Sequence, residues 1–140
     1  MRILAVDHGE KRIGLALSDP TATIASPFKV IQHVSRVMDA AQVANLAAEN
    51  EVALIVIGQS YDEEGNPTLA GRRAAKFAEA LKSQTQIPVI LWDESFSTQD
   101  ARAARIEMGV SRKERSGHMD ELAAVMILKS YLEANKPMVE

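Results

Sequence analysis

Residues 3–19 read ILAVDHGEKRIGLALSD, and this stretch decides the fold. Its first four residues are apolar and are typical of a buried strand that ends at Asp7. A second apolar run, residues 12–18, follows after the tight connection Gly9-Glu10-Lys11, which suits a hairpin. The chain therefore opens with two paired strands, and an acidic residue stands at the end of the first.

The later segments alternate between apolar runs of strand length and amphipathic runs of helical period. The predicted strands cover residues 1–7, 12–18, 25–33, 53–57 and 88–92. The predicted helices cover residues 35–50, 68–84, 97–109 and 118–134, with a basic loop at 110–117. Short links between the first three strands predict an antiparallel meander, and helical links between the later ones predict parallel strands. The expected fold is α/β, a mixed central sheet flanked by helices.

Length and composition favour one globular domain over residues 1–140, with 46% hydrophobic and 25% charged residues. The chain has no cysteine, which excludes disulfides, thiolate nucleophiles and zinc–thiolate sites. No signal peptide is visible, and no apolar run approaches the roughly 18 residues of a membrane span. We therefore expect a cytoplasmic protein with no membrane partner.

Three acidic residues stand where packing alone does not explain them. Asp7 and Glu94 both follow apolar strands, and side chains at the carboxyl ends of neighbouring parallel strands meet in one crevice. Asp120 begins a helical stripe that continues through residues 123, 124, 127, 128 and 131. This places Asp120 at the open end of the helix face that packs on the sheet. The three acids together predict a divalent-metal site.

Carboxylate oxygens suit Mg²⁺ or Mn²⁺, and two such ions can hydrolyse a phosphodiester bond. The predicted catalytic and metal-binding residues are Asp7, Glu94 and Asp120. Asp93 competes with Glu94, and because adjacent strand residues face opposite ways, we expect only one of the two to enter the site. His118 lies two residues before Asp120 and is an auxiliary candidate beside an ordinary loop histidine.

The net charge of −3 is not that of a strongly basic nucleic-acid binder, but the charge is uneven. Residues 102–115 carry five basic side chains against two acidic ones. Solvated surface charge is the alternative for each basic residue. The predicted phosphate contacts are Lys11, Arg12, Arg72, Arg73, Arg112, Lys113 and Arg115. The last three are favoured because they lead directly into Asp120.

Four segments carry a resemblance that covers nearly the whole chain in order: ILAVDHGEKRIGLALSD, VIGQSYDEEG, VILWDESFST and MDELAAVMILKSYL. They resemble the four blocks of the YqgF/RuvX family, RNase H-like proteins described as Holliday-junction resolvases and as nucleases that mature the 5′ end of pre-16S ribosomal RNA. The resemblance implies an RNase H-like fold, with site acids at Asp7, Glu94 and Asp120. This chain departs from the family where Ser95 replaces the usual arginine and Gln59-Ser60 replaces the usual Leu-Pro. Both departures bear on substrate contacts more than on metal ligation.

Other functions remain open at this point. A non-catalytic nucleic-acid-binding module of the same fold is one. An actin-like ATP phosphotransferase also opens with a strand, Asp-x-Gly and a hairpin, but needs two such lobes. A phospho-acceptor receiver domain conflicts with the opening meander. The expected partner is pre-rRNA or branched or single-stranded DNA, and the expected state is a monomer or homodimer.

Overall fold

The computed structural model of the chain describes residues 1–94 and 112–135, with side chains from residue 121 onward in the last helix. The predicted helix at 97–109, Ser95, and the basic residues Arg102 and Arg105 lie outside this part. The strands are β1 (Arg2–His8), β2 (Arg12–Ser18), β3 (Ala25–Gln32), β4 (Val52–Gln59) and β5 (Val89–Asp93). The helices are α1 (Arg36–Glu49), α2 (Leu69–Lys82) and α4 (Arg112–Ala134).

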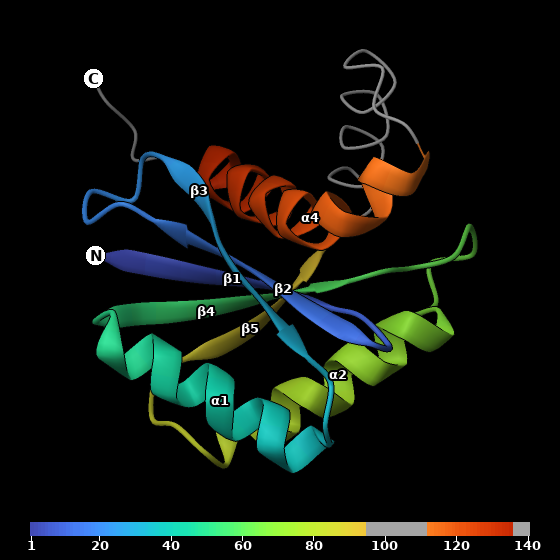
Figure 1. Cartoon of the computed structure of the whole chain (residues 1–140), viewed down its shortest axis with the longest axis horizontal. Coiled ribbons are helices and arrows are strands. Elements are labelled where there is room, and N and C mark those ends of the chain that lie inside the picture. Colours follow the sequence, from blue (N-terminus) through green and yellow to red (C-terminus); the bar gives the residue numbers. More distant parts are fainter. Residues whose placement is uncertain (95–111, 136–140) are drawn as a thin grey trace.

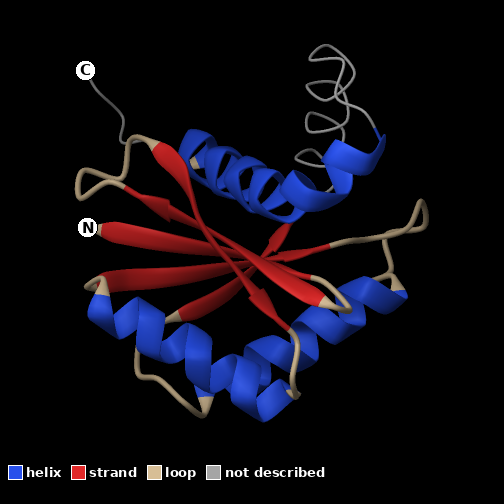
Figure 2. Cartoon of the chain, viewed as in Figure 1, coloured by secondary structure: helices blue, strands red, loops and turns tan. Residues whose placement is uncertain are grey.

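The five strands form one mixed sheet in the order β3-β2-β1-β4-β5 (Figure 2). Strand β2 pairs antiparallel with β1 and β3, whereas β4 pairs parallel with β1 and β5. The predicted meander followed by parallel strands is therefore confirmed. Because β1, β4 and β5 run in one direction, their carboxyl ends lie at one edge of the sheet.

Helices cover both faces of the sheet, with α1 and α2 on one side and α4 on the other (Figure 1). Side chains of β1 alternate between the two layers. Leu4 and Val6 belong to the core beneath α1 and α2, and Ile3 and Ala5 belong to the core beneath α4. Because alternate residues belong to opposite cores, each residue at a strand end can be assigned to the α1–α2 face or to the α4 face of the sheet.

The two helices on the first face begin at the caps that the sequence indicates. The Ser35 hydroxyl accepts a hydrogen bond from the Met38 amide at 3.1 Å, and the Thr68 hydroxyl accepts one from the Gly71 amide at 3.0 Å. Such caps satisfy amides that have no partner within the helix. Among the residues described, no helix is long and apolar enough to cross a membrane.

One predicted boundary is wrong. Residues 112–117 were expected in a loop, with the last helix starting near His118, but α4 already begins at Arg112. The segment RKERS consists largely of arginine, lysine and glutamate, which are strong helix formers. Their preference outweighs Gly117, which costs about 1 kcal/mol relative to alanine inside a helix. Arg112, Lys113 and Arg115 are thus helical residues rather than loop residues.

Candidate active site at the carboxyl end of the sheet

Asp7 is the second-to-last residue of β1, and strand alternation places it on the α4 face of the sheet. Ile3 and Ala5 lie in the core beneath α4, so the next residue of the same parity is Asp7. His8 falls on the opposite face, where its ring lies 4.7 Å from the ring of Phe77 in α2. The carboxylate therefore stands just beyond the apolar core that α4 covers.

Glu94 directly follows β5 and shares the face of Asp7. Ile90 and Trp92 pack in the core beneath α4, and Glu94 continues that series. Its amide donates to the carbonyl oxygen of Gln59 at 3.1 Å, which extends the β4–β5 pairing by one step. The backbone of Glu94 is thereby held at the end of the sheet rather than in a free loop.

Gly58 lies on β4 between the two acidic residues and leaves them room. A Cβ atom at this position would lie 2.6 Å from Glu94 Oε2 and 2.5 Å from Ile127 Cδ1. The Glu94 carboxylate thus lies directly over the glycine backbone. Gly14 is the antiparallel partner of Asp7 on the other side. Asp7 therefore has a glycine beside it on each neighbouring strand, Gly14 on β2 and Gly58 on β4, and neither position carries a side chain.

Burial raises the pKa of the Glu94 carboxyl, and the neighbouring Asp93 carboxylate raises the pKa further. Both effects disfavour the ionised form in the protein alone. A cation bound beside Glu94 would reverse this preference. The half-buried position of an ionisable group, one residue from a second carboxylate, is typical of a functional site rather than of a solvated surface.

Helix α4 is fixed over this edge by contacts from β5. The Trp92 indole N–H donates to the Ser130 hydroxyl at 3.1 Å, and the Trp92 ring meets the Tyr131 ring edge-on at 5.2 Å. Ile127 lies above Gly58, and Asp120 occupies the position two turns earlier in the same helix. Figure 1 shows that α4 begins near the edge where β1, β4 and β5 end.

Two of the three acids predicted to bind metal lie among the described side chains. Among residues 1–94 and 121–135, no group of three or more histidines or acids is placed to hold a metal ion. Asp7 and Glu94 contribute two hard-oxygen donors on one face of the sheet. This donor chemistry fits Mg²⁺ or Mn²⁺, with Asp120 as the remaining ligand that the sequence predicts.

Comparison with known proteins agrees with this architecture. The family model for RuvX, described as Holliday junction resolvase, matches residues 1–134. The chain belongs to this family.

Curated relatives of similar length support the assignment to the RuvX family. A protein of Thermoanaerobacter pseudethanolicus named "Putative pre-16S rRNA nuclease" is 38% identical over 137 residues, which is 97% of this chain and 99% of the relative. A protein of the same name from Anaeromyxobacter is 39% identical over 133 residues, which is 95% of this chain and 97% of the relative. The structure of T. thermophilus RuvC in complex with a Holliday junction substrate shares the fold at a TM-score of 0.58 and 15% identity, covering 96% of each chain. The expected RNase H-like fold is confirmed by these neighbours.

The predicted phosphate contacts do not all lie beside the acids. Arg12 is half-buried at the start of β2 and, by strand parity with Gly14, shares the face of Asp7. Lys11 is exposed in the β1–β2 turn. Arg72 and Arg73 are exposed on α2, on the other face, and Arg72 donates to the Pro67 carbonyl at 3.1 Å. The side chains of Arg112, Lys113, Arg115, His118 and Asp120 lie outside the described part.

Asp93 falls on the face opposite to Glu94, because it continues the parity of Val89 in the core beneath α1 and α2. The Asp93 side chain is exposed. Glu94, and not Asp93, therefore shares the face of Asp7.

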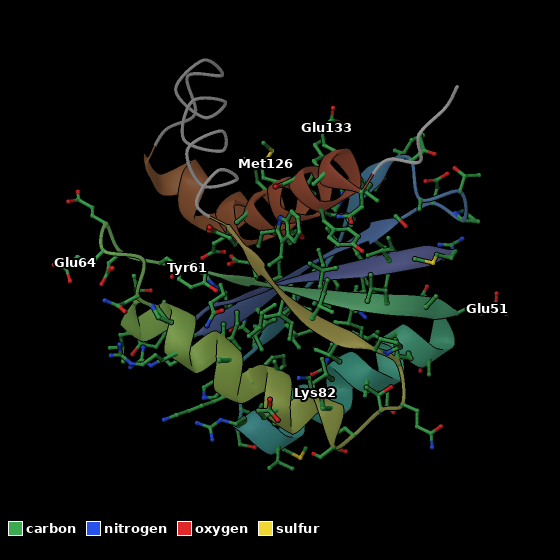
Figure 3. All side chains as sticks on the ribbon, turned by 180° about the vertical axis from the view of Figure 1, so that it is seen from behind. Glu51, Tyr61, Glu64, Lys82, Met126 and Glu133 are labelled. Atoms are coloured by element: carbon green, nitrogen blue, oxygen red, sulfur yellow. The ribbon has the colours of Figure 1, made fainter. Side chains whose placement is uncertain are left out.

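The Gln59-Ser60 departure from the RuvX pattern has a structural role. Gln59 is buried, its side-chain amide donates to the Gly71 carbonyl at 3.1 Å, and its side-chain oxygen accepts from the Tyr61 hydroxyl at 2.7 Å. Figure 3 shows Tyr61 beside the end of β4, with Glu64 farther out along the loop. These bonds tie the end of β4 to α2, so a polar residue replaces the usual leucine without leaving a buried amide unsatisfied.

Sequence reasoning missed Gly58 as a site residue. The available signal was a glycine that interrupts an apolar strand pattern, which often marks close approach of other groups. The neighbouring His8 packs half-buried against Phe77, where burial lowers its pKa.

Proposed function

We propose that the chain is a divalent-metal-dependent nuclease whose active site lies at the carboxyl end of the sheet on the α4 face. The observation that carries the proposal is the position of Asp7 and Glu94 on one face, with glycine backbone between and beside them. Membership of the RuvX family supports the same chemistry. In this proposal residues 1–140 form a single nuclease domain.

Asp7, Glu94 and Asp120 would hold Mg²⁺ or Mn²⁺. Two such ions supply an activated water and stabilise the leaving oxygen when they are bound. The chain contributes the geometry: β1 and β5 fix the carboxylates, Gly58 leaves room for the Glu94 carboxylate, and Trp92 anchors α4. Arg12, which shares this face, is the described cation best placed to orient a phosphate.

The proposed substrate is the 5′ end of pre-16S ribosomal RNA, because the similar full-length relatives carry that name. A four-way DNA junction is the second candidate, since the RuvX model is described as Holliday junction resolvase. Both substrates present structured phosphodiester backbones to the same set of acids. The site chemistry is shared, and the substrate is decided by contacts outside the acids.

Cleavage assays test the proposal. Purified protein with Mg²⁺, Mn²⁺ or EDTA is incubated with a pre-16S 5′ leader, a four-way junction and single-stranded oligonucleotides. We expect cleavage only with a divalent ion, and loss of at least 100-fold in rate for Asp7→Asn and Glu94→Gln. Asp93→Asn is the matched control, because it removes an adjacent carboxylate on the opposite face.

Two outcomes would contradict the proposal. Cleavage that persists in Asp7→Asn would mean that the acids are not the catalytic centre. Tight binding in EDTA without any cleavage in Mg²⁺ or Mn²⁺ would instead identify a non-catalytic binding module of the RuvX fold.

A further inference from the structure

A second cluster of charged and polar side chains lies at the same end of the sheet but on the opposite face from Asp7. It lines a cavity of about 370 Å³. The lining residues are His8, Glu10, His33, Ser35, Arg36 and Arg73. They come from the end of β1, the β1–β2 turn, the β3–α1 connection, the start of α1 and α2, so five parts of the chain converge on one cavity.

The cavity is built mainly from hydrogen-bond donors that suit a phosphate group. Arg36 and Arg73 bring two guanidinium groups, which bind phosphate oxygens with charge-assisted bonds. Ser35 caps α1, a helix of 14 residues, so the positive end of its dipole also faces this region. Two cations from different elements beside this helix end distinguish the cavity from a solvated surface.

A buried acid near the cavity already has hydrogen-bond partners. Asp39 is 1% exposed, lies 2.5 Å from His33 Nδ1 through Oδ2, and accepts the Val34 amide at 2.9 Å. Both of its oxygens are therefore engaged within the β3–α1 connection. The same contacts fix His33 and the start of α1 at the rim of the cavity.

Glu10 is the opposing charge. Its Oε1 lies 3.7 Å from Arg73 Nη1, and both side chains are exposed, at 74% and 44%. An exposed pair at this distance is weak. A phosphate that enters the cavity would take Arg73 away from Glu10, so Glu10 competes with the ligand rather than completing the site.

We propose that this cavity binds a phosphate group of the nucleic-acid substrate, as a second anchor separate from the acids. The inference rests on the proposed nuclease function. Asp7 and His8 are consecutive residues whose side chains point to opposite faces of β1. A polynucleotide that passes the end of β1 can reach the acids on one face and the cavity on the other. The phosphate is either an internal diester or a 5′-terminal monoester.

Equilibrium binding in EDTA tests the anchor without cleavage. Labelled single-stranded oligonucleotides with a 5′-phosphate or a 5′-hydroxyl are titrated with wild type, Arg36→Gln, Arg73→Gln and Glu10→Gln. Lys82→Gln is the matched control, since Lys82 is an exposed cation in the last turn of the helix that carries Arg73. Melting curves establish that the variants fold.

We expect Arg36→Gln and Arg73→Gln each to weaken binding about fivefold or more and to lower the salt slope by about 0.7, the value for one lost phosphate contact on a single strand. Glu10→Gln should tighten binding, and Lys82→Gln should leave it unchanged. If the 5′-phosphate strengthens wild-type binding and Arg36→Gln removes that gain, the ligand is the terminal monoester. Equal weakening for both oligonucleotides identifies an internal diester.

Binding by both arginine variants within twofold of wild type, with unchanged salt slopes, would overturn the inference. Cleavage measured on the same preparations separates the two proposals. If wild type cleaves and the arginine variants bind as wild type does, the nuclease proposal holds and the anchor proposal fails. If the arginine variants bind more weakly but wild type does not cleave, the anchor proposal holds and the nuclease proposal fails.

Discussion

Gly58 shows how a residue without a side chain can define a catalytic geometry. The Glu94 carboxylate and the Ile127 methyl group occupy the space that a Cβ atom would need. Ile127 is buried in the core beneath α4, whereas the Glu94 side chain is only half-buried. Of the two groups, Glu94 is the freer to move, so a larger residue at position 58 should displace the carboxylate first.

Gly58→Ala is therefore expected to reduce the cleavage rate by about tenfold to 100-fold, because small displacements of catalytic groups have effects of this order. Overpacking should also cost about 1–3 kcal/mol of unfolding free energy. Steady-state kinetics and urea unfolding measure the two effects. The double variant Gly58→Ala/Ile127→Val removes Cδ1 and should lose less stability than the sum of the single changes. Recovery of full activity in the double variant would mean that displacement of α4, not of Glu94, caused the loss.

The raised pKa of Glu94 predicts a pH-dependent stability. Its folded pKa lies above the ordinary glutamate value of 4.5, so its stabilising contribution is complete below that pH and is lost as the pH rises through the folded pKa. Without metal, Glu94→Gln should be more stable than wild type at neutral pH, and the difference should vanish near pH 4. Urea unfolding in EDTA across this range measures it, with the exposed Glu49→Gln as the control for loss of one charge. A stability gain equal to that of Glu49→Gln would contradict a special environment for Glu94.

At the residue scale, strand parity together with the family resemblance favoured Glu94 over Asp93, and the structure places Asp7 and Glu94 on one face and Asp93 on the other. The period of two residues survives in the structure because both faces of the sheet are buried under helices. The role of Gly58 was not predictable in the same way. It depends on which atoms of β5 and α4 arrive above the glycine, and this is a property of tertiary packing rather than of local sequence.

Among the elements, the β3–α1 connection depends on an acid that the helical pattern does not reveal. Asp39 lies in the first turn of α1 and is buried, with its two oxygens bonded to the Val34 amide and to His33. The sequence predicts a helix from residue 35 onward but gives no reason to bury a charged residue four positions later. Asp39 is buried because the connection from β3 to α1 folds His33 and the Val34 amide against its carboxylate.

Asp39→Ala should destabilise the protein by about 1–3 kcal/mol, because it leaves the partly buried Val34 amide and the His33 ring without their acceptor. Thermal and urea unfolding measure the loss. Ser35→Ala is the comparison within the same connection, and loss of that cap should cost about 1 kcal/mol. A smaller effect for Asp39→Ala than for Ser35→Ala would mean that water replaces the carboxylate and that the connection does not depend on it.

The start of α4 is the element-scale error of the sequence analysis. The charged segment after Ser111 was read as a loop because it lacks an apolar stripe and contains Gly117. Helix propensity acts without such a stripe, so a helix anchored farther along by Ala124, Ile127 and Leu128 extends outward through good helix formers. The amphipathic pattern locates the packed part of a helix and not its full length.

For the molecule as a whole, the sheet separates two cores, one packed against α1 and α2 and the other packed against α4. Core residues on alternating positions of β1 and β4 contact α1 and α2 on one side and α4 on the other. The same strands thus serve both layers, and neither layer keeps a complete core without them. This sharing is the physical reason to expect that the chain unfolds as one unit.

Trp92, the only tryptophan, reports on the α4 side through its contacts with Ser130 and Tyr131. We expect the urea transition followed by Trp92 fluorescence to coincide with the transition followed by far-ultraviolet circular dichroism, as two-state unfolding requires. Ser130→Ala removes the indole partner and should shift both curves together by about 1 kcal/mol. Ser130 lies in α4, whereas α1 and α2 contribute to the dichroism signal from the other layer. A joint shift of the two curves therefore demonstrates coupling across the sheet. A fluorescence transition that moves to lower urea while the dichroism transition stays in place would show that α4 undocks on its own, and the chain would then be two cooperative units instead of one.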